Sequence, residues 1–173
     1  MRLTLTELII CAQPYTDPRI GLTPEFATAV AWVESGGDTS AVGDRGRAVG
    51  LLQFHPETWV RCTRRPWMDR HFVDANFLAF QAECREAARK LKARKLPVTP
   101  TALANYHNQG SLRTTPTAYS RRLLNTLACI TQIEWLFWGP VGERKEIPWK
   151  GCMPRKLPVT LTALANYHNQ GWL

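Results

Sequence analysis

Residues 33–54 read VESGGDTSAVGDRGRAVGLLQF, and helical patterns lie on both sides of this stretch. Residues 36–50 contain five glycines and little apolar periodicity, which predicts a loop or short hairpin with several positive φ angles. The stretch lacks the Gly-Lys-Ser/Thr ending of a phosphate-binding loop, and no strong strand precedes it. The pattern therefore predicts a glycine-rich turn region and argues against a nucleotide site.

The segment before this stretch carries the signals of a helix start. Residues 23–25 (Thr-Pro-Glu) supply a capping hydroxyl, a proline at the first helical position and an acid in the first turn. Phe26, Val30 and Val33 follow at helical spacing, so we expect a helix that ends near Glu34. An acid at a helix C-terminus is disfavoured by the negative end of the dipole, which indicates a role for Glu34 other than helix stability.

The segments after the glycine-rich stretch are also helical in pattern. Residues 55–59 read as the start of a short helix, and residues 71–95 as a long helix with one apolar side. Threonine-proline signals at 99–100 and 115–116 predict two further helices, the first ended by Gly110 and the second reaching as far as Trp138. The expected order is one helix, a glycine-rich loop, then three or four helices.

Four motifs follow one another in an order that indicates a family. They are Val33-Glu34-Ser35, Ser40-Ala41-Val42-Gly43, the segment GLLQFHPETW at 50–59, and the segment ANYHNQG at 104–110, with YSRRLL at 119–124 behind them. This combination resembles the soluble lytic transglycosylase (SLT-type) family of the lysozyme-like superfamily, whose pattern is an E-S at a helix end, a glycine-rich stretch, G-L-x-Q and a later A-Y-N-x-G. The likeness covers roughly residues 22–127.

This resemblance implies a mainly α, lysozyme-like α+β fold: a helical domain with a short glycine-rich loop or β-hairpin after the catalytic helix. It implies a peptidoglycan-cleaving enzyme that acts on the β-1,4 bond between MurNAc and GlcNAc. Glu34 would be the catalytic acid, because glycoside cleavage needs a carboxylic acid that can protonate the leaving oxygen. Burial against apolar neighbours such as Val33 would favour its protonated form.

Hydrolysis by such enzymes commonly uses a second carboxylate, and the candidates near Glu34 in the sequence are Asp38, Asp44 and Glu57. In the resembled family a single glutamate suffices, acting next as a base on the sugar's own C6 hydroxyl and leaving a 1,6-anhydro-MurNAc product. We therefore expect a lytic transglycosylase. A hydrolytic muramidase and a non-catalytic glycan-binding or structural lysozyme-fold module remain the alternatives.

The resemblance also implies residues that bind substrate. Gln53 would hydrogen-bond sugar in the groove, Ser35 would help to form the turn beside the acid, and Tyr106 would hold Glu34 or sugar by its hydroxyl. The family's Y-N is interrupted here as Tyr106-His107-Asn108. Either His107 or Asn108 can therefore occupy the asparagine position, and we assign it to Asn108.

Composition and charge limit the other possibilities. The chain has 173 residues and a formal net charge of +8, which would attract any polyanion, including nucleic acid, anionic lipid or bacterial cell wall. A solvated helix face explains the densest basic run, residues 85–95, as well as a nucleic-acid-binding patch does. Only the net charge favours a nucleic-acid binder, so this function is not expected.

Cysteine and histidine usage gives no metal or disulfide pattern. The five cysteines are an odd number without a CxxC, and the four histidines lie far from them, so zinc-ligand spacings are missing. We expect no cofactor and no metal, and we interpret the histidines as structural or incidental.

Residues 94–110 recur almost identically at 155–171, with Leu161 in place of Pro100. A single near-identical copy indicates a local duplication rather than a solenoid. We expect a helical lead-in at 1–21, the transglycosylase domain at 22–127 and a C-terminal extension at 128–173, with the first copy as the folded one.

The N-terminus lacks the features of a secretory signal peptide, because Glu7 and two threonines interrupt its apolar residues. No stretch is apolar enough for a membrane span. The expectation is a monomer made in the cytoplasm that acts on glycan strands in the periplasm or cell wall. A phage or prophage endolysin released by a holin fits best, with a virion component or a secreted effector as alternatives.

Overall fold

The computed structural model describes residues 1–138, and the second copy of the repeat lies outside them. The fold is mainly helical with one two-stranded sheet, which confirms the expected lysozyme-like class. In chain order the elements are α1 (Leu5–Ala12), the 3-10 turns η1 (Gln13–Tyr15) and η2 (Pro18–Ile20), α2 (Pro24–Ser35), β1 (Val42–Gly43), η3 (Asp44–Gly46), β2 (Ala48–Val49), α3 (Pro56–Cys62), η4 (Trp67–His71), α4 (Val73–Ala93), α5 (Pro100–Gln109) and α6 (Ala118–Trp138).

Helix α2 begins and ends where the local sequence predicts. The Thr23 hydroxyl accepts a hydrogen bond from the Phe26 amide, and Pro24 occupies the first turn. The helix ends at Gly36, whose φ of 61° is in the left-handed region that glycine adopts at low cost. This end places Glu34 and Ser35 in the last turn of α2.

The glycine-rich stretch forms a tight antiparallel hairpin, as predicted. Val42 pairs with Val49 and Gly43 with Ala48, and the 3-10 turn η3 joins the two strands. Gly50 follows the hairpin at a φ of +88°, and a Cβ there would collide with the Arg70 carbonyl oxygen. Only glycine suits both this backbone conformation and this close approach.

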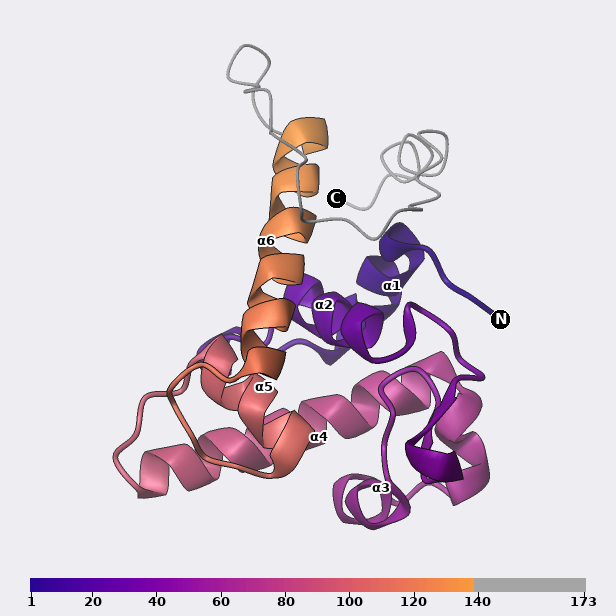
Figure 1. The fold of residues 1–173 in the computed structure, drawn as a ribbon, viewed down its shortest axis with the longest axis horizontal. Helices are drawn as coiled ribbons and strands as arrows, with labels where there is room; N and C mark the ends of the chain where they lie inside the picture. Colours follow the sequence, from indigo (N-terminus) through magenta and orange to yellow (C-terminus); the bar gives the residue numbers. More distant parts are fainter. Residues whose placement is uncertain (139–173) are drawn as a thin grey trace.

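The helices surround one core. Helix α2 packs against α1 and α6, while α5 packs against both α4 and α6. Figure 1 shows α4 running crosswise below, with α6 rising from α5 beside α2. The centre is filled by large apolar side chains, including Phe26 and Phe80, whose rings stack at 6.1 Å. Because α2 lies in the middle of this arrangement, its C-terminal end meets residues from α4, α5 and α6.

The structure is continuous across the predicted domain boundaries. Helix α1 adds Leu8 and Ala12, both fully buried, to the core, and α6 continues through residue 128 without a break. The division of the chain into three parts therefore stays a prediction.

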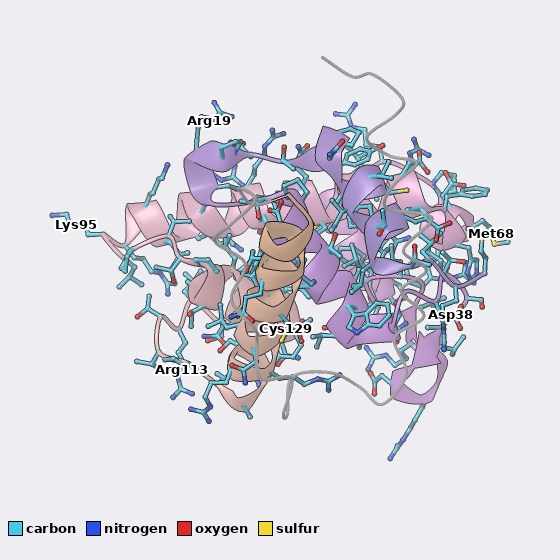
Figure 2. All side chains as sticks on the ribbon, turned by 90° about the horizontal axis from the view of Figure 1, so that it is seen from above. Arg19, Asp38, Met68, Lys95, Arg113 and Cys129 are labelled. Atoms are coloured by element: carbon cyan, nitrogen blue, oxygen red, sulfur yellow. The ribbon has the colours of Figure 1, made fainter. Side chains whose placement is uncertain are left out.

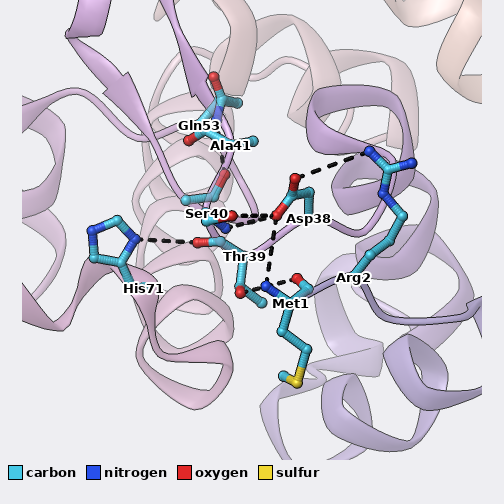
Figure 3. A network of polar contacts seen from close by, with 9 residues as sticks. Met1, Arg2, Asp38, Thr39, Ser40, Ala41, Gln53 and His71 are labelled. Carbon is cyan, nitrogen blue, oxygen red and sulfur yellow. Dashed lines mark hydrogen bonds and ion pairs between the residues drawn. The ribbon is translucent and has the colours of Figure 1, made fainter.

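The loop after α2 is fixed by the N-terminal segment (Figure 3). The Leu3 amide donates to the Gly37 carbonyl oxygen at 2.9 Å, and the Thr39 amide donates to the Met1 carbonyl oxygen at the same distance. On the other side of the loop, His71 Nδ1 lies 3.3 Å from the Thr39 carbonyl oxygen. These contacts hold the chain that leads from Glu34 to the hairpin.

The surface carries its charges in separate places. In Figure 2, Arg19, Lys95 and Arg113 project outward from different parts of the ribbon. All three are exposed.

None of the helices within residues 1–138 is both long enough and apolar enough to cross a bilayer.

Candidate active site

Glu34 faces a pocket at the C-terminal end of α2. Its side chain is 18% exposed. The pocket has a volume of about 150 Å³. Its lining comes from α2, the β2–α3 region, α4 and α5: Glu34, Ala48, Gln53, Phe54, His55, Thr58, Glu83, His107 and Asn108. Helix, turn and loop residues thus converge on one carboxyl group that solvent can still reach.

Tyr119, in the first turn of α6, contacts this carboxyl directly. Its hydroxyl donates a hydrogen bond of 2.5 Å to Glu34 Oε1. Burial, followed by the charge of Glu34 and this hydrogen bond, raises the pKa of Tyr119 far above its usual value, so the hydroxyl keeps its proton. On the exposed side, Arg122 donates to the Val33 carbonyl oxygen at 3.0 Å, which fixes the same turn of α2 to α6.

Asn105 determines where α6 begins. Its side chain is buried and donates to the carbonyl oxygens of Arg113 and Thr115, at 2.8 and 3.0 Å. Its own oxygen accepts a hydrogen bond from the Thr117 hydroxyl. These bonds tie the α5–α6 loop to α5 and so place Tyr119 opposite Glu34.

His107 of α5 is the second group beside the carboxyl. Its Nε2 lies 3.8 Å from Glu34 Oε1, and its Nδ1 lies 2.6 Å from Oε2 of Glu83 on α4. The imidazole is 6% exposed and packs edge to face with the rings of Phe54 and Phe80, at centroid distances of 5.6 and 5.2 Å. Burial lowers the pKa of His107, but the charge of Glu83, the hydrogen bond with it and the charge of Glu34 outweigh burial, so the pKa lies above the usual value.

Glu83 is itself held from the far side. Its side chain is 3% exposed, and Arg61 of α3 lies 3.7 Å from its Oε1. Arg61 also pairs with Glu86 at 3.0 Å. A chain of alternating charges therefore runs from the pocket to the surface between α3 and α4.

Tyr106, which the family resemblance predicted beside Glu34, lies elsewhere. It is buried, does not line the pocket, and its hydroxyl accepts a hydrogen bond of 2.6 Å from Lys90. The Tyr106 hydroxyl does not contact the acid, because one step along a helix turns the side-chain direction by about 100° and brings His107 to the carboxyl instead. The alternative expectation, that Tyr106 binds sugar, stays a prediction. The phenolic hydroxyl on Glu34 comes from Tyr119.

Gln53 lines the pocket but uses its amide to shape the turn. Its Nε2 donates to the carbonyl oxygens of Ala41 and Gly50, at 3.1 and 2.8 Å, from a backbone φ of +50°. Asn76 supports the same turn from α4, where its buried side chain accepts from the Leu52 amide and donates to the Arg70 carbonyl oxygen. The G-L-x-Q motif is thus a hydrogen-bonded corner in the wall of the pocket.

Ser35 and Asn108 occupy different positions relative to the pocket. The Ser35 hydroxyl donates to the Ala31 carbonyl oxygen within α2 at 3.0 Å, and Ser35 does not line the pocket. Asn108 is exposed and lines the pocket one residue beyond His107. Asn108 remains a predicted substrate-binding residue, while the observed role of Ser35 is within its helix.

The three carboxylates considered as partners of Glu34 lie outside the pocket lining. Asp38 accepts hydrogen bonds from the amide and hydroxyl of Ser40, which hold its pKa below the usual value. Glu57 is exposed and pairs with Arg47 at 3.1 Å. Asp44 pairs with His55 at 3.4 Å, and only His55 of that pair reaches the pocket.

The sequence interpretation does not include Tyr119, Asn105 or Glu83 in the site, and it names His107 only as the alternative to Asn108 for the family's asparagine position. Glu83 did carry a signal, since it lies on the face of α4 that buries Phe80, Cys84 and Ala87. A glutamate on an apolar face needs a partner. That partner is His107, whose Nδ1 lies 2.6 Å from Glu83 Oε2.

No group of three or more potential metal ligands occurs within residues 1–138. Cys11, Cys62 and Cys84 are free thiols, and burial raises the pKa of Cys62 to about 11. The chemistry available around Glu34 is that of its carboxyl group, the phenol that donates to it and the neighbouring imidazole. Such a set can give a proton to a bound oxygen and take one back.

Comparison with known families agrees with this geometry. Residues 16–73 match the family model described as "Transglycosylase SLT domain", from just before α2 to the start of α4. The match confirms the SLT-type, lysozyme-like resemblance for this segment and indicates a family of peptidoglycan-degrading lytic transglycosylases. It contains Glu34, Ser35 and Gln53, whereas His107 and Tyr119 lie beyond it. No curated protein and no solved structure matches the chain.

Proposed function

We propose that this chain cleaves the β-1,4 bond between N-acetylmuramic acid and N-acetylglucosamine in peptidoglycan, with Glu34 as the catalytic acid. The observation that carries the proposal is the position of Glu34. It lies at the end of α2 within the segment that matches the SLT family, faces a pocket, and accepts a hydrogen bond from Tyr119. A carboxyl group held in this way can meet the bridging oxygen of a bound glycan.

In the first step protonated Glu34 gives its proton to the bridging oxygen as the bond from that oxygen to C1 of the muramic sugar breaks. In the second step the Glu34 carboxylate takes the proton of the C6 hydroxyl of the same sugar while that oxygen bonds to C1. The products are a new glycan end and a 1,6-anhydromuramic end. Glu34 returns to its protonated form, and no water is consumed.

The pocket lining supports a mechanism with one acid. Among the described residues, Glu83 is the other carboxylate of the lining, and both its oxygens are already engaged, with His107 and with Arg61. Asp38 and Glu57 have partners of their own away from the lining. A second free carboxylate, which a hydrolase would use to activate water, is therefore not part of the proposal.

The test is the clearing of purified peptidoglycan sacculi by Glu34→Gln, with Glu25→Gln in the first turn of the same helix as the matched control. We expect the Glu34 variant to lose about 10²–10⁴-fold in rate, the usual contribution of a general acid, and to keep its circular dichroism spectrum. The Glu25 variant should clear sacculi like the parent. Clearing by Glu34→Gln at the parent rate would remove Glu34 from the mechanism.

Mass spectrometry of the released fragments tests the reaction type. Anhydromuramic ends are lighter than reducing ends by one water. The fragments released by the proposed reaction should therefore be lighter by one water than the fragments that hydrolysis would give. Reducing ends would instead indicate a hydrolytic muramidase. Binding to sacculi without any soluble fragments would indicate a non-catalytic module.

A further inference from the structure

The pair His107–Glu83 lies directly behind Glu34 and has no part in the proton transfer described above. The three groups come from three helices and form a line in which the imidazole sits between two carboxyl groups, at 3.8 Å from Glu34 and 2.6 Å from Glu83. Glu83 and the imidazole are both nearly inaccessible to solvent. Burying an acid and a base together is costly unless they are paired, so the arrangement needs an explanation.

Charged and titratable groups face this line from each packed element. Arg61 on α3 faces Glu83, and Cys62 beside it is a half-buried thiol that stays protonated because its pKa is about 11. Tyr119 on α6 faces Glu34 and keeps its proton. The imidazole also forms a backbone hydrogen bond with Leu52, which favours its charged form, and it meets the rings of Phe54 and Phe80 edge to face.

We propose that His107, kept as an imidazolium by Glu83, is a positioning residue that stabilises the carboxylate of Glu34 after its proton has left. The inference rests on the proposed function and names a group that the family pattern does not supply at this position. His107 itself does not touch substrate atoms in this role and keeps its proton throughout the cycle. The proton moves only between Glu34, the bridging oxygen and the C6 hydroxyl.

The physical basis is the charge that develops on Glu34. When Glu34 protonates the leaving oxygen it becomes an anion beside a nearly inaccessible imidazole, where a cation acts more strongly than it does in bulk water. The imidazolium is already in place, so no reorganisation is needed as the charge forms. Glu83 lies closer to the imidazolium than Glu34 does. Its negative charge therefore balances the imidazolium while Glu34 is neutral.

The first test follows the titration of His107 by NMR in the full chain labelled with ¹³C at histidine, with the resonance assigned from His107→Gln. We expect Glu83→Gln to lower the titration midpoint by about one to three pH units. Glu34→Gln should lower it by less, because its oxygen is farther away. Glu57→Gln, which removes an exposed carboxylate beside Arg47, is the matched control and should leave the midpoint unchanged.

The second test is the pH profile of kcat for His107→Gln. Loss of the imidazolium favours the protonated form of Glu34, so the alkaline fall in activity should move to higher pH. The maximal kcat should drop by about tenfold, less than the roughly 10²–10³ lost with a donor in direct contact, while KM stays within a factor of about two. A merely structural role would lower the whole profile without moving its alkaline side.

The two proposals fail in different ways. Unchanged titration of His107 in Glu34→Gln, or an unmoved alkaline limb in His107→Gln, would overturn the role of His107. This titration needs neither substrate nor turnover, and it does not depend on whether Glu83→Gln folds. Retained clearing by Glu34→Gln would instead overturn the proposed function.

Discussion

The hydroxyl of Tyr119 and the carboxyl of Glu34 are 85 positions apart in the sequence and 2.5 Å apart in the fold. This hydrogen bond connects the first turn of α6 to the last turn of α2. It fixes one oxygen of the acid, Oε1, while the carboxyl group remains partly open to the pocket. The orientation of the proposed acid therefore depends on where α6 begins.

Tyr119→Phe should lower kcat by about tenfold or more and change KM little. The variant removes one hydrogen bond to a group that carries charge during the reaction, and such a bond contributes roughly 1.5–3 kcal/mol. The measurement is the initial rate of sacculus clearing over a range of substrate concentrations. Tyr15→Phe is the control, because that ring stacks on Phe77 away from the pocket and should leave kcat unchanged. A parent-like kcat in Tyr119→Phe would show that the bond has no role in catalysis.

Local signals in the sequence placed Glu34 well. The cap at Thr23, the proline at the first helical position and the glycine at position 36 all act within a few residues, so they can be interpreted without the rest of the fold. The hairpin is predicted for the same reason, whereas Gln53 comes from the family resemblance, and its contact with sugar stays a prediction. The family match covers this same part of the chain.

The identity of the groups around Glu34 could not be predicted in this way. Tyr106 and Tyr119 both lie on predicted helices, and which hydroxyl reaches the acid depends on how α5 and α6 cross α2. Rotation by a single residue turns Tyr106 toward Lys90 and His107 toward Glu34. Which side chain reaches Glu34 depends on long-range packing between helices, and a single sequence does not reveal that packing.

Asn76→Ala should destabilise the fold and weaken activity together. Asn76 is fully buried, and its loss leaves the Leu52 amide and the carbonyl oxygens of Arg70 and Phe72 without this partner. An unsatisfied buried polar group costs about 1–3 kcal/mol, so the free energy of unfolding should fall by roughly 3 kcal/mol. Urea denaturation measures this loss. Gln81→Ala, which removes one bond from the same helix to the Thr16 carbonyl oxygen, should cost about 1 kcal/mol or less. Equal losses in the two variants would contradict the anchoring role of Asn76.

Gly50→Ala should lower stability by more than the few tenths of a kcal/mol typical of a surface substitution. The residue has a φ of +88°, and its added methyl group would meet the Arg70 carbonyl oxygen, so both the backbone and η4 must shift. Gly46→Ala is the control, since it has a similar φ of +91° but open space around the position of a Cβ. Thermal unfolding should give a lower Tm for Gly50→Ala than for Gly46→Ala. Similar Tm values would mean that the close approach costs nothing beyond the strained φ.

Asp17→Asn should remove a contribution to stability that depends on acid pH. Asp17 accepts two hydrogen bonds of 2.9 Å from Arg19 and one of 3.0 Å from Arg85, which joins the start of the chain to α4. The hydrogen bonds from Arg19 and then Arg85 hold the pKa of Asp17 far below its usual value, against the opposing effect of burial.

A carboxyl group whose pKa is lower in the folded state stabilises the fold above its unfolded pKa, near 3.9, and loses that contribution as the pH falls toward the folded value. The Tm of Asp17→Asn should therefore lie below that of the parent at pH 7 and at pH 5, and the difference should shrink below about pH 4. Asp74→Asn, which breaks an exposed ion pair with Arg65, is the control and should change Tm little at pH 7. A difference between Asp17→Asn and the parent that stayed constant from pH 7 down to pH 2 would show that the two arginines contribute through packing rather than through the charge of Asp17.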